Sequence, residues 1–335
     1  MIRKLSILTN RLMGALALVS SCTTCCNVSA EEFVRIGYWT SGASLGYGYI
    51  LEETNFLAKR GVHAKYVHFS DVNAPIRALA AGSIDIAFGA PVAGVFSASA
   101  EGVPIRIFAA TQPADVQFAV PADSPIKSLD QFKGKKIGMS PVGSSVAAIA
   151  CAILAGNYGV RAGDFSLVGG SESRLVQFLL QRQVDGAALR SLTIDQLPEE
   201  HNVRLLSSFA DEWFKLTKSH AVPYMGVGAV ASKLVDKNPK TIANVILGLR
   251  DTLVWGATHR DEVVSILQRA ASLPSNAARV YADHWLATTR VSFDTADVDT
   301  LMLQYKIFAE SGLIKGAISE DLFDRRAYEL ANIAD

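Results

Sequence analysis

The chain has 335 residues, of which 50% are hydrophobic and 19% are charged. This length fits about two domains of ordinary size, and the composition is typical of a compact globular protein and excludes a disordered chain. The 32 Lys and Arg residues balance 32 Asp and Glu residues. No basic run alternates with aromatic residues, so we expect no nucleic-acid partner.

The first 30 residues have the pattern of an export signal. A basic region, a short apolar run and a small-residue cleavage site follow one another: Arg3, Lys4 and Arg11, then residues 12–19, then Val28-Ser29-Ala30. The apolar run is less than half of the roughly 20 residues needed to span a bilayer, so we predict a signal peptide at residues 1–30, cleaved after Ala30, and a periplasmic protein. Cleavage removes three basic and no acidic residues, which leaves 29 basic against 32 acidic residues.

Three of the four cysteines precede that cleavage site and leave Cys151 alone in the mature chain. An unpaired thiol in an oxidising compartment is best kept buried, so we expect a buried Cys151 and no disulfide. Val19-Ser20-Ser21-Cys22 resembles a lipoprotein signal, in which the cysteine is lipidated and becomes the new N-terminus. A lipid anchor at Cys22 is therefore the alternative localisation.

Predicted strands and helices alternate along the first part of the mature chain. The strands are expected at residues 33–39, 64–69, 84–88 and 105–110, with helices at 49–59, 73–82 and 91–100. Asn73 is the expected N-cap of the second helix, with Pro75 in its first turn. This alternation predicts a mainly parallel sheet.

The pattern then restarts, with a strand at 136–139 and a helix at 144–156. Gly61-Val62, a strand, a helix and Asp85 recur as Gly159-Val160, a strand, a helix and Asp185. We interpret this as one βαβ module used twice. An apolar stretch at 221–231 returns the chain to the first half, and helices follow at 238–259, from Asp261, and at 297–311.

We therefore predict an α/β fold of two lobes with mainly parallel sheets. Lobe one comprises residues 31–120 and 222–335, and lobe two comprises residues 121–221. Hinge strands near 116–121 and 221–226 join the lobes, and the cleft between them closes by hinge motion.

Two motifs suggest catalysis but lie in the wrong context. Gly42-Ala43-Ser44-Leu45-Gly46 matches the GxSxG of esterases, yet the expected turn is loose and no downstream His stands out. The run 226–231 matches a dinucleotide fingerprint but lies inside an apparent strand. The sequence has no HExxH motif and no carboxylate pair outside segments that look solvated. We predict a binding protein without enzymatic activity, cofactor or metal.

Ligands of parallel α/β sheets bind outside the carboxyl ends of the strands, so the small and polar residues that follow the predicted strands are the candidate binding residues. They are Trp39, Thr40, Ser41, Gly89, Ala90, Pro91, Thr111 and Gln112 in lobe one, and Ser140, Gly143, Ser144, Ser145 and Arg190 in lobe two. The predicted helix after Gly143 offers N–H groups, hydroxyls and a dipole that suit an oxyanion, although an ordinary serine cap has the same sequence. Two roles are open for Arg190. Its guanidinium binds a carboxylate or sulfonate of the ligand, or it forms a salt bridge between the lobes.

Six segments in order carry a family resemblance. They are RIGYW (35–39), FSDVNAPIRALAAGSIDIAFGAP (69–91), DSPIKSLDQFKGKKIGMSPVGSSVA (123–147), QFLLQRQVDGAA (177–188), YADHWLATTRVSFD (281–294) and AESGLI (309–314). Together they resemble the periplasmic solute-binding proteins of the nitrate, sulfonate and taurine ABC importers, with aliphatic-sulfonate binders the most similar.

The resemblance covers nearly all of 33–325 and implies a Venus-flytrap fold of type II. It also implies a monomer that delivers a small anionic solute of sulfonate type to an ABC permease. The family places the anion at the helix that here begins with Gly143-Ser144-Ser145, and it lines the cleft with the loops at 39–41 and 89–91.

One segment departs from the family. After the lobe-two strand, the family usually has Trp, an acidic residue, Pro and an aromatic residue, whereas this chain has Leu189-Arg190-Ser191-Leu192. The added Arg favours a carboxylate or a more strongly anionic ligand than a simple alkanesulfonate.

Two alternatives share the fold. One is a binder of a pyrimidine or another aromatic precursor, with Trp39, Tyr47, Tyr49 and Tyr224 as stacking partners. The other is an enzyme of the thiamine-pyrimidine synthase type, which uses a cysteine-rich motif with histidine ligands. Only Cys151 survives the predicted cleavage, so the enzyme is the weaker alternative.

Overall fold

A computed structural model describes residues 33–197 and 203–334, which belong to one compact unit. The predicted signal peptide, its cleavage site at Ala30 and the alternative lipid anchor at Cys22 lie outside the described residues. Within those residues Cys151 is buried and makes no disulfide. None of the described helices is both long and apolar enough to cross a membrane.

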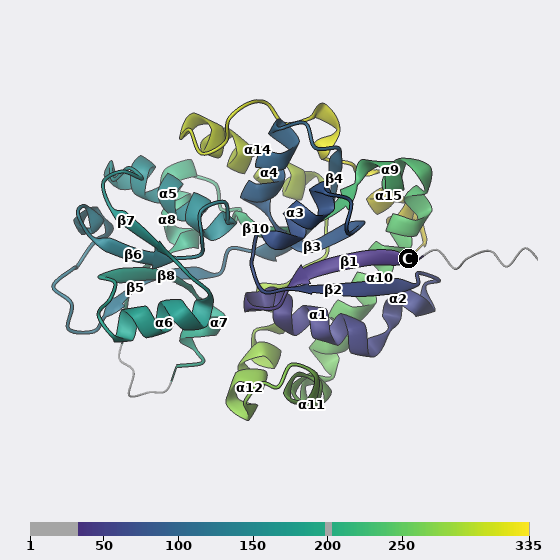
Figure 1. The fold of residues 1–335 in the computed structure, drawn as a ribbon, viewed down its shortest axis with the longest axis horizontal. Helices are drawn as coiled ribbons and strands as arrows, with labels where there is room; N and C mark the ends of the chain where they lie inside the picture. Colours follow the sequence, from purple (N-terminus) through teal and green to yellow (C-terminus); the bar gives the residue numbers. More distant parts are fainter. Residues whose placement is uncertain (1–32, 198–202, 335) are drawn as a thin grey trace, which may run out of the picture. The chain divides into compact units, whose positions relative to one another are not determined.

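Two five-stranded sheets organise the described residues (Figure 1). The first has the order β2-β1-β3-β10-β4, from Ala64–Phe69, Val34–Trp39, Ile86–Pro91, Tyr224–Ala231 and Ile105–Pro113. The second has the order β7-β6-β8-β5-β9, from Ser166–Gly169, Lys136–Met139, Gly186–Arg190, Val116–Pro121 and Val203–Ser208. In each sheet the first three strands are parallel and the fourth runs antiparallel to both of its neighbours.

Helices follow most of the strands. Those of the first half are α1 (Gly42–Thr54), α2 (Phe56–Lys59), α3 (Ala74–Ala80), α4 (Val92–Ala100), the 3-10 turn η1 (Leu129–Phe132) and α5 (Ser145–Tyr158). Those of the second half are α6 (Glu172–Leu180), α7 (Ser191–Ile194), α8 (Phe209–Thr217), α9 (Ser232–Lys237), α10 (Pro239–Thr258), α11 (Arg260–Ala270), α12 (Ser275–Asp283), α13 (Trp285–Thr288), α14 (Thr295–Glu310), η2 (Glu320–Leu322) and α15 (Arg326–Ala334).

The first three strands of the two sheets correspond in order, β2-β1-β3 with β7-β6-β8, as the internal repeat predicts. Asp85 precedes β3 and accepts a hydrogen bond from the backbone N–H of Arg35 at 2.8 Å. Asp185 precedes β8 and accepts the same bond from Lys136 at 2.8 Å. The N–H of Asp85 also donates to the carbonyl of Arg35, and the N–H of Asp185 donates to the carbonyl of Lys136, both at 2.8 Å. The recurring aspartate thus ties the start of one parallel strand to the start of the next.

The chain passes between the sheets at residues 114–115 and again at 218–223. The segments predicted as hinge strands are β5, which belongs wholly to the second sheet, and β10, which belongs to the first. The residue boundaries of the two lobes stay a prediction, and sheet membership puts the first crossing at 114–115.

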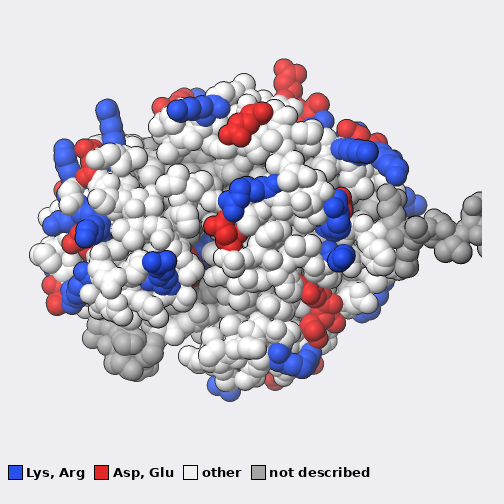
Figure 2. Space-filling model, in the orientation of Figure 1, with Lys and Arg blue, Asp and Glu red and all other residues white. Residues whose placement is uncertain are grey.

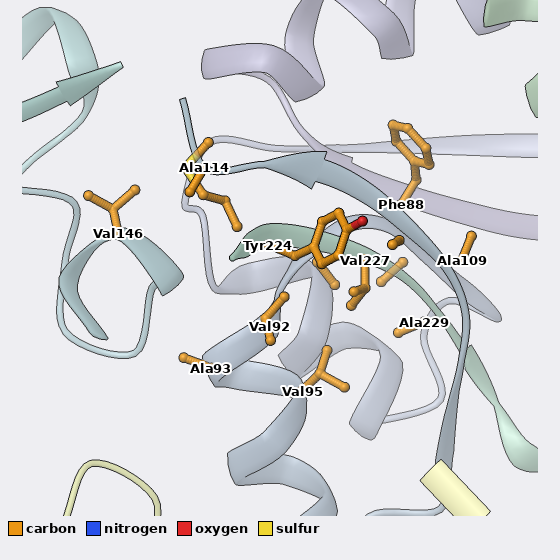
Figure 3. Packing of buried hydrophobic residues seen from close by; sticks show 14 of the residues in the cluster. Phe88, Val92, Ala93, Val95, Ala109, Ala114, Val146, Tyr224, Val227 and Ala229 are labelled. Carbon is orange, nitrogen blue, oxygen red and sulfur yellow. The ribbon is translucent and has the colours of Figure 1, made fainter. Parts of the chain in front are cut away.

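One hydrophobic cluster runs through both sheets where α4 and α5 approach each other. Figure 3 shows Val92 and Ala93 of α4 on one side and Val146 of α5 on the other. All three side chains are at most 3% exposed. The first turns of these helices are therefore fixed by packing from both lobes.

One helix begins earlier than the sequence predicts. The prediction is a helix over 49–59, but α1 begins at Gly42, in the Gly/Ser-rich stretch after β1, and ends at Thr54. Asn55 follows α1 with a left-handed backbone, φ +54°, and this residue separates α1 from α2. The expectation was wrong because small residues that favour turns also let a helix pack closely: a Cβ at Gly48 would lie 2.2 Å from the Tyr38 ring.

Charges of both signs are scattered over the molecular face drawn in Figure 2. Lys and Arg alternate there with Asp and Glu among many uncharged residues. This face has no broad basic patch of the kind that binds nucleic acid.

Candidate functional site

A small cavity lies where the carboxyl ends of the two sheets face each other. It is lined by Trp39, Val72, Gly89, Pro91, Gln112, Ser144, Ser145, Val146, Arg190 and Met225. These residues belong to both sheets or to the segments that follow their strands, and they include seven of the predicted binding residues. The cavity measures about 10 Å³, which is room for about one water. A solute of several heavy atoms therefore enters only when the two sides separate.

The N-terminus of α5 forms one wall. Ser144 caps the helix, and its hydroxyl accepts a hydrogen bond from the N–H of Ala147 at 3.2 Å. The Ser145 hydroxyl accepts one from the N–H of Ala93 at 3.3 Å, which leaves its own proton available to a ligand. The first-turn N–H groups have no acceptor within the helix, and the dipole of this 14-residue helix favours an anion beside them.

Gln112 forms a second wall and is rigidly held. Its Nε2 donates to the Ser44 hydroxyl at 2.7 Å, and both residues are buried. Glycines flank the amide: a Cβ at Gly89 would lie 2.8 Å from Gln112 Nε2, and a Cβ at Gly226 would lie 2.8 Å from its Oε1. Because Gly89 also has φ +64°, glycine is required there by backbone conformation as well as by space.

Arg190, at the end of β8, is the one ionisable residue among the ten that line the cavity. It is 5% exposed, and its Nη1 is hydrogen-bonded to the carboxylate of Glu172 on α6. Its Nε is buried and has no hydrogen-bond partner. Its guanidinium carbon lies 5.2 Å from the centre of the Trp39 ring, at cation–π distance. Glu172, which comes shortly after β7 as the first residue of α6, was missed from the sequence because no local pattern links it to Arg190.

The comparisons with known proteins bear on this geometry. A model of the family described as "ABC transporter, phosphonate, periplasmic substrate-binding protein" matches residues 49–276, which is more than half of the chain. The chain belongs to this family. The expectation of a solute-binding protein of an ABC importer is therefore confirmed.

Relatives with solved structures share the fold of this periplasmic substrate-binding protein. The alkanesulfonate-binding protein SsuA of Xanthomonas axonopodis pv. citri, bound to MOPS, is 20% identical, with a TM-score of 0.70 over 85% of this chain and 95% of that one. The aliphatic sulphonate binding protein SsuA of Escherichia coli is 20% identical, with a TM-score of 0.70 over 87% and 90%. Among proteins compared by sequence alone, the "Putative binding protein BAB2_1146" of Brucella abortus (strain 2308) is 24% identical over 70% of each chain. The two-lobed Venus-flytrap fold of type II is thus confirmed.

The other seven predicted binding residues of this substrate-binding protein do not line the cavity. They are Thr40, Ser41, Ala90, Thr111, Ser140, Gly143 and Tyr224. Thr40 donates its hydroxyl to the Phe69 carbonyl at 3.1 Å. Tyr224 donates its hydroxyl to Asp297. Sequence position after a strand identified the neighbourhood, and the side-chain partners decide which residues face inward.

The stacking partners of the aromatic-ligand alternative are placed mostly in the core. Tyr47 is 1% exposed and stacks on Phe88 and Trp285, with ring centroids 4.8 and 5.4 Å away. Tyr49 packs against Tyr38, 6.3 Å between ring centroids. Trp39 alone of the four predicted partners lines the cavity.

The two motifs that suggested catalysis are structural. Ser44 lies inside α1, is 1% exposed and accepts its hydrogen bond from Gln112. The run 226–231 lies within β10, with no turn that starts a helix. Among residues 33–197 and 203–334, no three His, Cys, Asp or Glu side chains are arranged to hold a metal ion.

Contacts between the two sides hold the cleft together. Asn73 Nδ2 donates to the Val142 carbonyl at 3.0 Å, at the loop before α5. His284, which follows α12, is hydrogen-bonded to Asp195, which follows α7, at 2.7 Å. Together with the bond from Ala93 to Ser145, they close the cleft around the cavity.

Proposed function

We propose that this protein is the extracytoplasmic receptor of an ABC importer and binds a small organic anion of sulfonate type in the cleft between its lobes. One observation carries the proposal: the α5 N-terminus and the unpartnered Nε–H of Arg190 line the same cavity. Both are donors suited to an oxyanion. Trp39 offers an apolar wall to the organic part of the solute.

The neighbours support the same class of ligand. Two solved relatives are named for alkanesulfonate or aliphatic sulphonate binding, and one of them holds MOPS, which is an organic sulfonate. We propose that the solute enters an open form, that the hinge at 114–115 and 218–223 then closes, and that a permease receives the closed, liganded monomer. The predicted cleavage after Ala30 would release the receptor into the periplasm.

A thermal-shift panel tests the proposal. The panel contains taurine, longer alkanesulfonates, nitrate, carboxylates and pyrimidines. A ligand at 100 times its Kd adds about 2.7 kcal/mol, so a true solute raises Tm by several degrees. We expect a shift with alkanesulfonates. A shift with pyrimidines alone would support the aromatic alternative, and no shift with any anion would overturn the proposal.

A pair of serine variants then locates the site. Ser145→Ala removes a hydroxyl at the α5 N-terminus and should weaken sulfonate binding about tenfold or more, because hydrogen bonds to charged groups are worth about 1.5–3 kcal/mol. Ser128→Ala is the matched control in the same lobe, since the Ser128 side chain makes no cap bond. Equal affinities of the two variants in isothermal titration calorimetry would place the anion elsewhere.

A further inference from the structure

The cavity in the closed cleft is too small for the organic part of a solute. It measures about 10 Å³, and the donors at α5 and Arg190 account only for the charged end of an anion. Hydrogen bonds that span the lobes, such as the one from Asn73 Nδ2 to the Val142 carbonyl at 3.0 Å, form only when the lobes close fully. A fully closed, liganded cleft must therefore gain its space from a lining side chain that moves.

The polar and aromatic side chains of the cavity are tethered. Hydrogen bonds within the protein hold Gln112, Ser144, Ser145 and Arg190. Trp39 donates its Nε1–H to the Ser70 carbonyl at 3.3 Å, and its ring lies against the Arg190 guanidinium. Movement of any of these side chains would leave a buried polar group without a partner, which is costly. They form the fixed part of the cavity wall.

Met225 differs from the other apolar residues of the wall. Val72 and Val146 are β-branched and stiff at χ1, and the ring of Pro91 is rigid. Methionine is unbranched, with several rotatable bonds and a polarisable thioether that adapts to irregular space. Met225 is 5% exposed. Among the described lining residues, it is the side chain that can change rotamer without breaking a hydrogen bond.

The backbone of β10 explains why Met225 faces the cavity. Successive residues of a strand point to opposite faces of the sheet. The Tyr224 hydroxyl is bonded to Asp297 of α14, whereas Met225 lines the cavity. The register of β10 against β4 shifts between Tyr224 and Gly226, and such an irregularity changes the direction of a side chain. Met225 also lies directly after the second crossing between the lobes, at 218–223.

We infer that Met225 is a specificity-determining residue that sets which lengths of organic chain the bound anion can carry. This inference rests on the proposed function and adds a rule for the organic part of its ligand. It applies equally to sulfonate and phosphonate head groups. A longer chain displaces the methionine, so the chain gains buried area while the methionine loses some. The receptor therefore accepts a range of unbranched alkyl anions, with an affinity that rises gradually with length.

The wild-type protein provides the first test. Isothermal titration calorimetry measures the affinity for unbranched alkanesulfonates from methanesulfonate to octanesulfonate. One CH₂ that enters space already open to it raises affinity about fourfold. We expect a smaller gain, about twofold per CH₂, because each added group must displace part of Met225.

Two variants change the wall in opposite ways. Met225→Ala opens space beyond Cβ, so methanesulfonate should bind more weakly and each further CH₂ should gain about fourfold until that space is filled. Met225→Leu conserves volume but removes the flexible end, so methanesulfonate should bind as before and octanesulfonate about tenfold more weakly or worse. Met139→Leu is the matched control, because Met139 is also buried, at the end of β6, but does not line the cavity. It should leave the length dependence unchanged.

Methyl NMR of ¹³C-methionine follows the movement in the wild-type protein. The Met225 signal is assigned by its absence from the Met225→Leu spectrum. We expect it to shift progressively as the bound sulfonate becomes longer. The signals of Met139 and of Met302, which is exposed on α14, should stay constant across the liganded series.

The outcomes separate the two proposals. If no alkanesulfonate binds the wild-type protein, the proposed function fails, and alkylphosphonates of the same lengths then test Met225 by itself. If neither series binds, both proposals fail. If the anions bind with one length dependence in the wild type, Met225→Ala and Met225→Leu, the role of Met225 fails while the receptor function stands. A Met225 signal that ignores chain length would also overturn it. If Met225→Ala does not fold, the volume-conserving Met225→Leu and the wild-type NMR series still decide.

Discussion

The buried pair of Arg190 and Glu172 predicts a strongly non-additive double-mutant cycle. Arg190→Met leaves the Glu172 carboxylate with Thr193 as its remaining side-chain partner, and Glu172→Gln leaves the guanidinium without its counter-charge. Both side chains are at most 7% exposed. Removal of one partner from such a pair costs about 3–5 kcal/mol. We expect each single variant to lose that much free energy of unfolding.

The double variant Arg190→Met with Glu172→Gln should lose only about 1–2 kcal/mol, because no unpaired charge remains buried and the amide still accepts from Thr193. Urea denaturation followed by circular dichroism measures all four free energies. The same double variant should fold and yet bind sulfonate weakly, since the Nε–H donor is gone. Single variants that cost less than about 1 kcal/mol, or costs that simply add, would refute the reasoning.

Two further predictions concern the cavity wall and the internal repeat. Gly89→Ala should lower the free energy of unfolding by about 2 kcal/mol or more, because the backbone has φ +64° and the new Cβ would lie 2.6 Å from the Ser44 hydroxyl. Gly102→Ala is the control: Gly102 has φ +84° but nothing within 4 Å of its Cβ, so it should cost only the backbone strain of about 1–2 kcal/mol. Urea denaturation measures both free energies. Burial raises the pKa of Asp85, but hydrogen bonds from the side chain and backbone of Arg35 outweigh it and hold that pKa below its usual value. The ion pair therefore adds stability above about pH 4 that is lost as pH falls through the depressed pKa. Asp85→Asn should destabilise the protein at pH 7 and have little effect at low pH, and an equal cost at both would contradict the assignment.

The sequence predicted the arrangement of the sheets better than the side chains of the site. The strand at 64–69 and the cap at Ser144 agree with the structure because period, turn chemistry and capping are local properties. Asn73 takes the predicted N-cap position but makes no side-chain cap bond, because its amide donates to Val142. The repeat around Asp85 and Asp185 predicted two similar sheets, because the same hydrogen bond is needed at the same place in each.

The side chains of the site depend on distant partners. Position after a strand selected Gln112, and an aromatic ring suited to stacking selected Tyr224. The Ser44 hydroxyl holds Gln112 at the cavity, while Asp297 holds the hydroxyl of Tyr224. Arg190 was identified because it departs from the residues that the resembling family usually has after this strand. Glu172 lies 18 residues before it on another element, and no local pattern in the sequence links the two.

The way the chain crosses between the sheets also sets an order of folding. The second sheet is built from one continuous stretch, from β5 at Val116 to β9 at Ser208, so each of its pairings closes a loop of fewer than about 100 residues. The first sheet lacks its fourth strand until β10, at Tyr224–Ala231, returns between β3 and β4. Loop-closure entropy and the direction of synthesis both delay that pairing. The lobe that comes second along the chain should therefore become protected from hydrogen exchange first, and the lobe that carries the N-terminus should complete its sheet around the returning strand.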